Sequence, residues 1–182
     1  MREIYIRVYH IDLLTAALIM LGLVIVWSVI GVLFAKNMRT ICVTAVVISG
    51  VIIFLLTLCA RGEVGASRDM MPLALFRRGV NEPPILRSIM MNVFLFIPLG
   101  MSLPYLIRSS AWIRMLLTVL IGFCVSCGIE LIQRFFAVGM TQADDVISNT
   151  LGMAIGACTY PLTLLWAALI RKYRGKDRTP RE

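Results

Sequence analysis

Long apolar stretches, each closed by a charged residue or a turn, dominate the pattern of this chain. The five stretches cover residues 13–35, 40–60, 88–107, 111–133 and 146–170. A helix needs about 20 predominantly apolar residues to cross the hydrocarbon core of a membrane. The pattern therefore predicts an all-α protein, a polytopic transmembrane helical bundle of about five spans. The fourth span is the least regular, because it carries Arg114 and Glu130 near its two ends.

The connections between the stretches divide the chain into three parts. The short connection 36–39 predicts that residues 1–62 form a transmembrane hairpin. The long connection 61–87 contains the apolar patch Met70–Phe76 followed by Arg77-Arg78 and a Pro-Pro pair. That mixture predicts a segment lying in the membrane interface with its apolar side down, and an ordinary surface loop is the alternative. We expect residues 63–170 to form the core and residues 171–182 a basic tail.

Composition excludes a water-soluble globule. The chain is 59% hydrophobic and 15% charged, with a mean hydropathy of +0.88, whereas soluble domains are about 45–50% apolar and about 25% charged. The formal charge of +8 does not indicate a nucleic-acid partner, because a nucleic-acid binder clusters its basic residues on one surface. Here the basic residues flank the apolar stretches.

Charge also bears on orientation. Five spans place the two termini on opposite sides of the membrane, and nearly all acidic residues fall on the N-terminal side, with Asp177 and Glu182 as the exceptions. Lys and Arg are slightly more numerous on the other side, where the basic tail lies. The positive-inside rule therefore favours a cytoplasmic C-terminus and an N-terminus outside.

Polar residues that bilayers tolerate poorly gather at the N-terminal side of the bundle. They are Arg87 and Asn92 at the start of the third span, Glu130, Gln133 and Arg134 at the end of the fourth, and Asp144, Asp145 and Asn149 at the start of the fifth. Spacings of three and four place the members from one span on one helix face. Such residues inside a membrane tend to mark functional sites, so these eight are the predicted ligand-binding residues. Helix capping is the alternative for the two aspartates.

A small-residue motif follows in the fifth span. Gly152 and Gly156 form a GxxxG pair, which favours close contact between transmembrane helices. We expect this contact to bring Asp145 and Asn149 near Glu130 and Gln133.

Three motifs carry a resemblance to a known family. Asn92–Gly100 resembles N-x-x-x-F-x-P-x-G, Glu130–Gln133 resembles E-x-x-Q, and Asp145–Gly152 resembles D-x-x-x-N-T-x-G. In this order they are typical of the VanZ-like family of integral membrane proteins. Met71-Pro72-Leu73 resembles a divergent form of another family segment, with Asp69 in place of an expected Asn. The loop before Asp145 lacks the Arg that is expected in that region of the family. The resemblance implies a bacterial cytoplasmic membrane and a connection to glycopeptide (teicoplanin) resistance or to envelope homeostasis.

Three functional hypotheses follow. In the first, an outward polar pocket binds a membrane lipid, a lipid-linked cell-wall precursor or a glycopeptide. Arg87 and Arg134 then hold an anionic group, while the three amide side chains bind sugar or peptide. In the second, the protein is an enzyme that modifies an envelope lipid with Glu130 and Asp145 as general acid and base. In the third, it is a small transporter.

Nothing in the sequence indicates a cofactor. The polar positions lack the His and Cys ligands that zinc prefers. Glu130, Asp144 and Asp145 could supply oxygen ligands to Mg²⁺ or Ca²⁺, which we treat as an alternative to a metal-free site.

Overall fold

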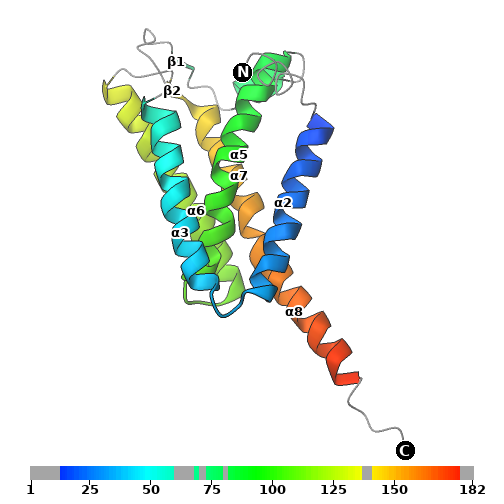
Figure 1. The fold of residues 1–182 in the computed structure, drawn as a ribbon. Coiled ribbons are helices and arrows are strands. Elements are labelled where there is room, and N and C mark those ends of the chain that lie inside the picture. Colours follow the sequence, from blue (N-terminus) through cyan, green and yellow to red (C-terminus); the bar gives the residue numbers. More distant parts are fainter. Residues whose placement is uncertain (1–12, 60–67, 70–72, 80–81, 137–140, 177–182) are drawn as a thin grey trace, which may run out of the picture.

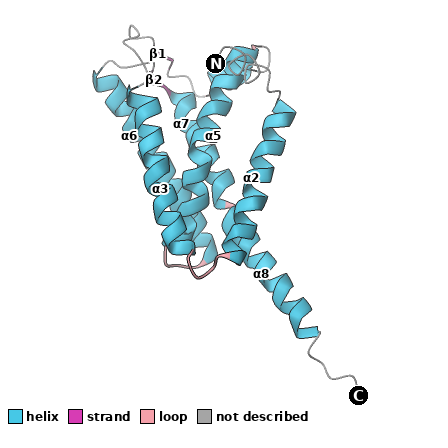
Figure 2. Cartoon of the chain, viewed as in Figure 1, coloured by secondary structure: helices cyan, strands magenta, loops and turns pink. Residues whose placement is uncertain are grey.

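The computed structural model of the protein describes residues 13–59, 68–69, 73–79, 82–136 and 141–176. This part of the chain is a bundle of long helices (Figures 1 and 2). The helices are α2 (Leu13–Leu33), α3 (Met38–Phe54), α4 (Ala74–Gly79), α5 (Pro83–Leu106), α6 (Ala111–Phe136), α7 (Ala143–Ala157) and α8 (Thr159–Lys176). Five helical segments, with α7 and α8 counted as one, are long and apolar enough to span a membrane. The prediction of an all-α bundle with five spans is confirmed.

A short turn joins the first two spans, α2 and α3, but these helices pack against different neighbours, α2 mainly against α8 and α3 against α5. Helix α2 is 21 residues long, which at about 1.5 Å per residue matches the thickness of a bilayer core of about 30 Å. A turn at residues 34–37 leads into α3. Helix α3 continues into a π-helix, η1 (Leu55–Cys59). A π-helical turn is rare and is often found next to a functional site.

Helix α5 starts five residues before the predicted span. It begins at Pro83, where proline is well tolerated because the first helical turn has no use for its missing N–H. It continues through Pro98 and Pro104. The Ser102 hydroxyl donates a hydrogen bond to the carbonyl of Pro98 at 2.9 Å within this stretch.

The fifth span is divided rather than continuous. The sequence predicted one helix over 146–170, but α7 ends at Ala157 and α8 begins at Thr159. Pro161 explains the division, because it has no N–H to donate to the carbonyl of Ala157. Helix α8 extends beyond the rest of the bundle (Figure 1).

Helices α5 and α7 form the centre of the bundle. Helix α7 packs against α5 on one side and α6 on the other, α3 packs against α5, and α2 packs against α8 (Figure 1). Phe96, Ile97 and Met153 are completely buried between them. The outer faces of α2, α3 and α6 expose many large apolar side chains. Such continuous apolar surface is expected where lipid rather than water surrounds a protein.

The glycines of the GxxxG pair contact α5. A Cβ atom on Gly152 or on Gly156 would overlap the backbone carbonyls of Val93 or Ile97, respectively. On the opposite helix, a Cβ on Gly100 would lie 2.5 Å from the carbonyl oxygen of Met153. The predicted close contact is therefore present, and α5 is the helix it brings against α7.

Two connections meet at the end of the bundle where α5 and α7 begin. Strand β1 (Arg68–Asp69) pairs in parallel with β2 (Thr141–Gln142), and Figure 2 shows where both lie on the bundle. Helix α4 packs mainly against α5. Met70, Met71 and Pro72, which belong to the predicted interfacial segment, lie outside the described residues.

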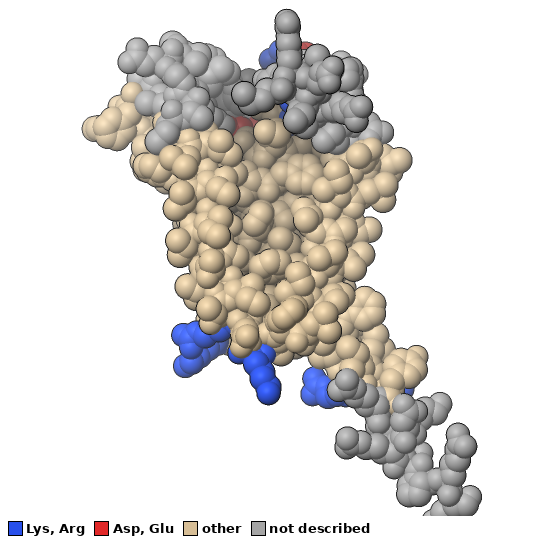
Figure 3. All heavy atoms as spheres, in the orientation of Figure 1, with Lys and Arg blue, Asp and Glu red and all other residues tan. Residues whose placement is uncertain are grey.

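Charged side chains lie at the two ends of the bundle, and the side seen in Figure 3 carries none between them. At the end where α8 emerges, the described residues include Lys and Arg but no Asp or Glu. Every described acidic residue lies at the other end, in β1, just before α5, at the end of α6 or at the start of α7.

Candidate functional site: a buried polar cluster

Six of the eight predicted site residues are buried at one end of the bundle. We refer to these six as the polar cluster: Asn92, Glu130, Gln133, Asp144, Asp145 and Asn149. Their exposed fractions do not exceed 8%, and that of Gln133 is 1%. Burial of this many polar and acidic groups costs free energy unless they find partners. The partners of each therefore decide what the cluster can do.

The first pair joins the two central helices. Asn92 of α5 donates a hydrogen bond from Nδ2 to Oδ1 of Asp145 on α7 at 2.6 Å. This contact crosses the interface that the glycine seam draws together, since Gly152 lies two turns after Asp145. A hydrogen bond to a charged group contributes about 1.5–3 kcal/mol. The bond therefore orients the Asp145 carboxylate within the cluster.

The second pair joins α7 to α6. Asn149 donates from Nδ2 to the hydroxyl of Ser126 at 2.7 Å, and Ser126 is completely buried. Ser126 was not among the predicted site residues. Its spacing of four residues before Glu130 places it on the same helix face and could have identified it.

Gln133 joins α6 to the π-helix after α3. Its Nε2 atom donates to the backbone carbonyl of Thr57 at 2.8 Å. Thr57 is itself buried, and its hydroxyl donates to the carbonyl of Ile53 at 2.7 Å. No sequence pattern predicted this partner, because the acceptor is a backbone carbonyl, which every residue type carries. The second span therefore contributes to the site, which the sequence had indicated from the third, fourth and fifth spans alone.

Asp144 fastens the long connection to the start of α7. Its Oδ1 atom accepts a hydrogen bond from the backbone N–H of Leu73 at 2.5 Å. Leu73 has a φ of 64°, in the left-handed region that residues other than glycine rarely adopt. This hydrogen bond therefore links the start of α7 to the residue before α4. It is separate from any capping of α7 by Asp144.

Two buried oxygen atoms in the cluster have no hydrogen-bond partner among the described residues. They are Oε1 of Gln133 and Oδ1 of Asn149. In each side chain the amide nitrogen is already engaged by the bonds above, so the free atom is an acceptor. Buried polar groups are nearly always paired in folded proteins. These two acceptors are therefore unmet by the described part of the chain.

The two arginines of the predicted site differ in position. Arg87 is half-buried on α5, whereas Arg134 is exposed on the last turn of α6. The structure thus does not bring Arg134 into the buried cluster. Among the described residues, no three Asp, Glu, His or Cys side chains gather closely enough to hold a metal ion. The alternative of a magnesium or calcium site gains no support there.

Comparison with known proteins agrees with the motifs. A sequence model of the VanZ/LLP1 family matches residues 18–166. The chain is 35% identical over 77 residues to Protein VanZ of Enterococcus faecium, a match covering 42% of this chain and 46% of that protein. The matched segment thus spans about half the length of the curated relative. No solved structure shows significant similarity. With five membrane-spanning segments and a family match over most of its length, the chain is a multi-pass membrane protein that belongs to the VanZ/LLP1 family.

Proposed function

We propose that the polar cluster binds the polar head of an amphiphile of the bacterial envelope. One observation carries this proposal: two buried carboxamide oxygens, on Gln133 and Asn149, lack donors beside the buried carboxylates. An unsatisfied buried acceptor costs about 1–3 kcal/mol. A ligand that donates hydrogen bonds to these atoms removes that cost, and the free energy gained favours binding.

The balance of donors and acceptors narrows the chemistry of the head. The two cluster atoms without a partner among the described residues are amide oxygens, which accept hydrogen bonds. Hydroxyl, amine and amide N–H groups can donate to them, whereas a bare anionic group has no donor to offer. The exposed position of Arg134 also weakens the hypothesis that two arginines hold an anion. A sugar, amine or peptide head of a lipid, a lipid-linked wall precursor or a glycopeptide satisfies the requirement.

The charge distribution supports an orientation for this site. Among the described residues, Lys and Arg are more numerous at the end where α8 emerges than at the other end, and Figure 3 shows basic side chains there. The positive-inside rule, which counts Lys and Arg, therefore favours a cytoplasmic position for that end. The polar cluster then faces outward, where envelope precursors and glycopeptides are encountered. A contribution to glycopeptide resistance is part of the same proposal, by resemblance to the family.

Retention of a bound amphiphile tests the proposal. The protein is extracted from bacterial membranes in a mild detergent, and molecules that remain bound are identified by native mass spectrometry. We expect the wild-type protein to retain an envelope amphiphile. Replacement Glu130→Gln or Asp145→Asn removes a charged acceptor worth about 1.5–3 kcal/mol, so retention should fall roughly 10- to 100-fold.

Glu82→Gln is the matched control, because Glu82 is an exposed acid that pairs with Arg78 on the surface. Its retention should equal that of the wild type. Equal retention in all three variants, with each folded, would contradict the proposal. If the polar cluster is responsible for resistance, the double variant Glu130→Gln/Asp145→Asn should change the teicoplanin susceptibility of the host when both proteins are expressed at the same level.

A further inference from the structure

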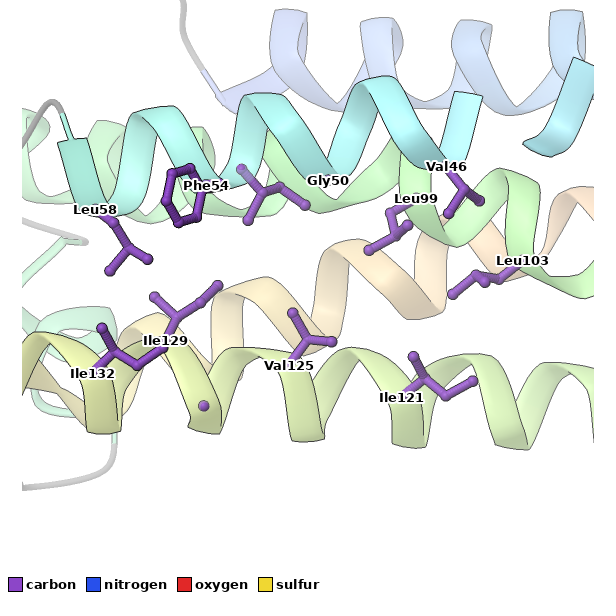
Figure 4. A pocket seen from close by; sticks show the side chains of 12 residues that line it. Val46, Gly50, Phe54, Leu58, Leu99, Leu103, Ile121, Val125, Ile129 and Ile132 are labelled. Atoms are coloured by element: carbon purple, nitrogen blue, oxygen red, sulfur yellow. The ribbon is translucent and has the colours of Figure 1, made fainter. Parts of the chain in front are cut away.

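An apolar groove runs along the bundle beside the polar cluster. It lies between α3 and α6, with α5 as its floor, and has a volume of about 500 Å³ (Figure 4). Its lining is aliphatic and aromatic: Val46, Gly50, Ile53, Phe54, Leu58, Leu99, Leu103, Ile121, Val125, Gly128, Ile129 and Ile132. Figure 4 shows side chains of α3 and α6 facing each other across this space. Small-molecule sites in proteins are typically about 300–1,000 Å³.

Two glycines keep the groove open. A Cβ atom on Gly50 of α3 or on Gly128 of α6 would meet no other atom within 4 Å. Unlike the glycines of the α5–α7 seam, these two make no close helix contact. Their lack of a side chain therefore widens the groove without serving helix packing.

The groove ends at the polar cluster. Leu58 and Ile132 line one end, and the residues next to them, Thr57 and Gln133, form the hydrogen bond between η1 and α6. The unpartnered Oε1 of Gln133 belongs to that same side chain. The hydrogen bond from Gln133 to Thr57 thus closes the end of the groove that lies nearest the polar cluster. An amphiphile with its chain in the groove therefore has its head at this end, beside the cluster.

The dimensions identify the occupant. From Val46 to Leu58 the groove follows α3 for about 18 Å at 1.5 Å per residue, close to the roughly 15 Å of hydrocarbon in one leaflet of a bilayer. A helix of the same length and about 10 Å wide fills roughly 1,400 Å³, far more than the space available. The groove therefore matches one extended hydrocarbon chain, whereas a helix from a second copy of the protein is too large to enter it and can only lie along its opening.

We propose that this groove holds one acyl chain of a bilayer lipid, taken from the leaflet that contains the polar cluster. The proposal rests on the proposed function and deepens it, since it makes the ligand a lipid held through both its chain and its head. A ligand without a long chain, such as a free peptide or glycan, fills only the polar part of the site. The lipid enters laterally, from the membrane between α3 and α6.

Photo-crosslinking tests this assignment. The full-length protein is placed in nanodiscs of phosphatidylglycerol and phosphatidylethanolamine that contain a phosphatidylglycerol with a diazirine on one acyl chain. After illumination, labelled residues are located by mass spectrometry. We expect labels on groove residues such as Ile53, Leu103 and Ile129. Gly50→Leu and Gly128→Leu fill the groove from opposite helices, and each should abolish this labelling.

Gly22→Leu is the matched control. A Cβ atom on Gly22 would also meet no other atom within 4 Å, but Gly22 lies on α2, away from the groove. Its groove labelling should equal that of the wild type. Labelling confined to outer surfaces, or groove labelling unchanged by both filling variants, overturns the proposal.

The two proposals fail separately. Groove labelling that persists while Glu130→Gln and Asp145→Asn leave lipid retention unchanged contradicts the role of the cluster alone. Retention that depends on these two acids while the groove stays unlabelled contradicts the acyl-chain site alone.

Discussion

Replacing Gly152 by alanine tests whether the α5–α7 contact holds the polar cluster together. A Cβ at this position would overlap the carbonyl oxygen of Val93 and lie 3.1 Å from the Cβ of Phe96. Carbon atoms pack best at about 3.5–4.0 Å. Because the main obstacle is backbone, it cannot rotate away as a side chain would. The two helices must therefore separate, by about 1 Å.

The cost has two parts. Overpacking a close contact costs about 1–3 kcal/mol. A separation of about 1 Å would also stretch the 2.6 Å bond between Asn92 and Asp145 beyond hydrogen-bonding distance, with a further loss of about 1.5–3 kcal/mol. We expect Gly152→Ala to destabilise the protein by about 2.5–6 kcal/mol. At about 2–4 °C per kcal/mol for a chain of this size, the unfolding midpoint should fall by roughly 5–24 °C.

Thermal unfolding of the purified protein in detergent, followed by intrinsic tryptophan fluorescence, measures this effect. Gly22→Ala is the control, because its Cβ meets no atom within 4 Å. Alanine is a better helix former than glycine by about 1 kcal/mol, so the control should be as stable as the wild type or slightly more stable. If Gly152→Ala matched Gly22→Ala, the close packing of α7 on α5 would not be what positions Asp145.

Three further substitutions test individual contacts by the same unfolding assay. Asn92→Ala removes the donor to buried Asp145 and should lower the free energy of unfolding by about 1.5–3 kcal/mol. In a double-mutant cycle with Asp145→Asn, the effects of the two substitutions on this free energy should not be additive. Ser126→Ala leaves the buried amide nitrogen of Asn149 without its acceptor and should cost about 1–3 kcal/mol. Trp27→Phe removes an indole N–H that donates to a backbone carbonyl of α5 at 3.1 Å and should cost about 0.5–1.5 kcal/mol.

Exposed residues of the same types provide the controls. Asn37→Ala, Ser88→Ala and Trp112→Phe alter side chains that are exposed in the structure, and the Asn37 side chain makes no capping hydrogen bond to α3. Surface changes of this kind are usually within about 0.5 kcal/mol of neutral. A buried substitution no more destabilising than its exposed counterpart would show that the corresponding hydrogen bond adds no net stability.

Hydropathy alone predicted the five spans, because the bilayer imposes a length and a composition on every helix that crosses it. Element ends were less accurate: α5 begins at Pro83, before the predicted start at Ser88. The division between α7 and α8 was not predicted, although Pro161 marks it. Proline is common in transmembrane helices, and whether it interrupts one depends on how neighbouring helices satisfy the freed carbonyl.

Local spacing also selected most of the buried cluster. The acids and amides of α6 and α7 recur at three- and four-residue intervals, so one helix face had to carry them. Spacing within a helix says nothing about rotation relative to its neighbours, which is why Arg134, directly after Gln133, was grouped with it although it is exposed. Thr57 was missed because its role arises between helices, whereas the spacing of Ser126 from Glu130 could have identified Ser126.

The sequence by itself determined the membrane environment, the number of spans, the end of the bundle that carries the acids, and the glycines that permit a close helix contact. These properties follow from composition and from periodicity along one helix. Only the tertiary structure decided that α5 is the partner of Gly152 and Gly156, that η1 closes the cluster through Gln133, and that α3 and α6 leave a groove beside it. Each of these depends on which helix faces are packed together, a choice made by the sum of contacts across the whole bundle.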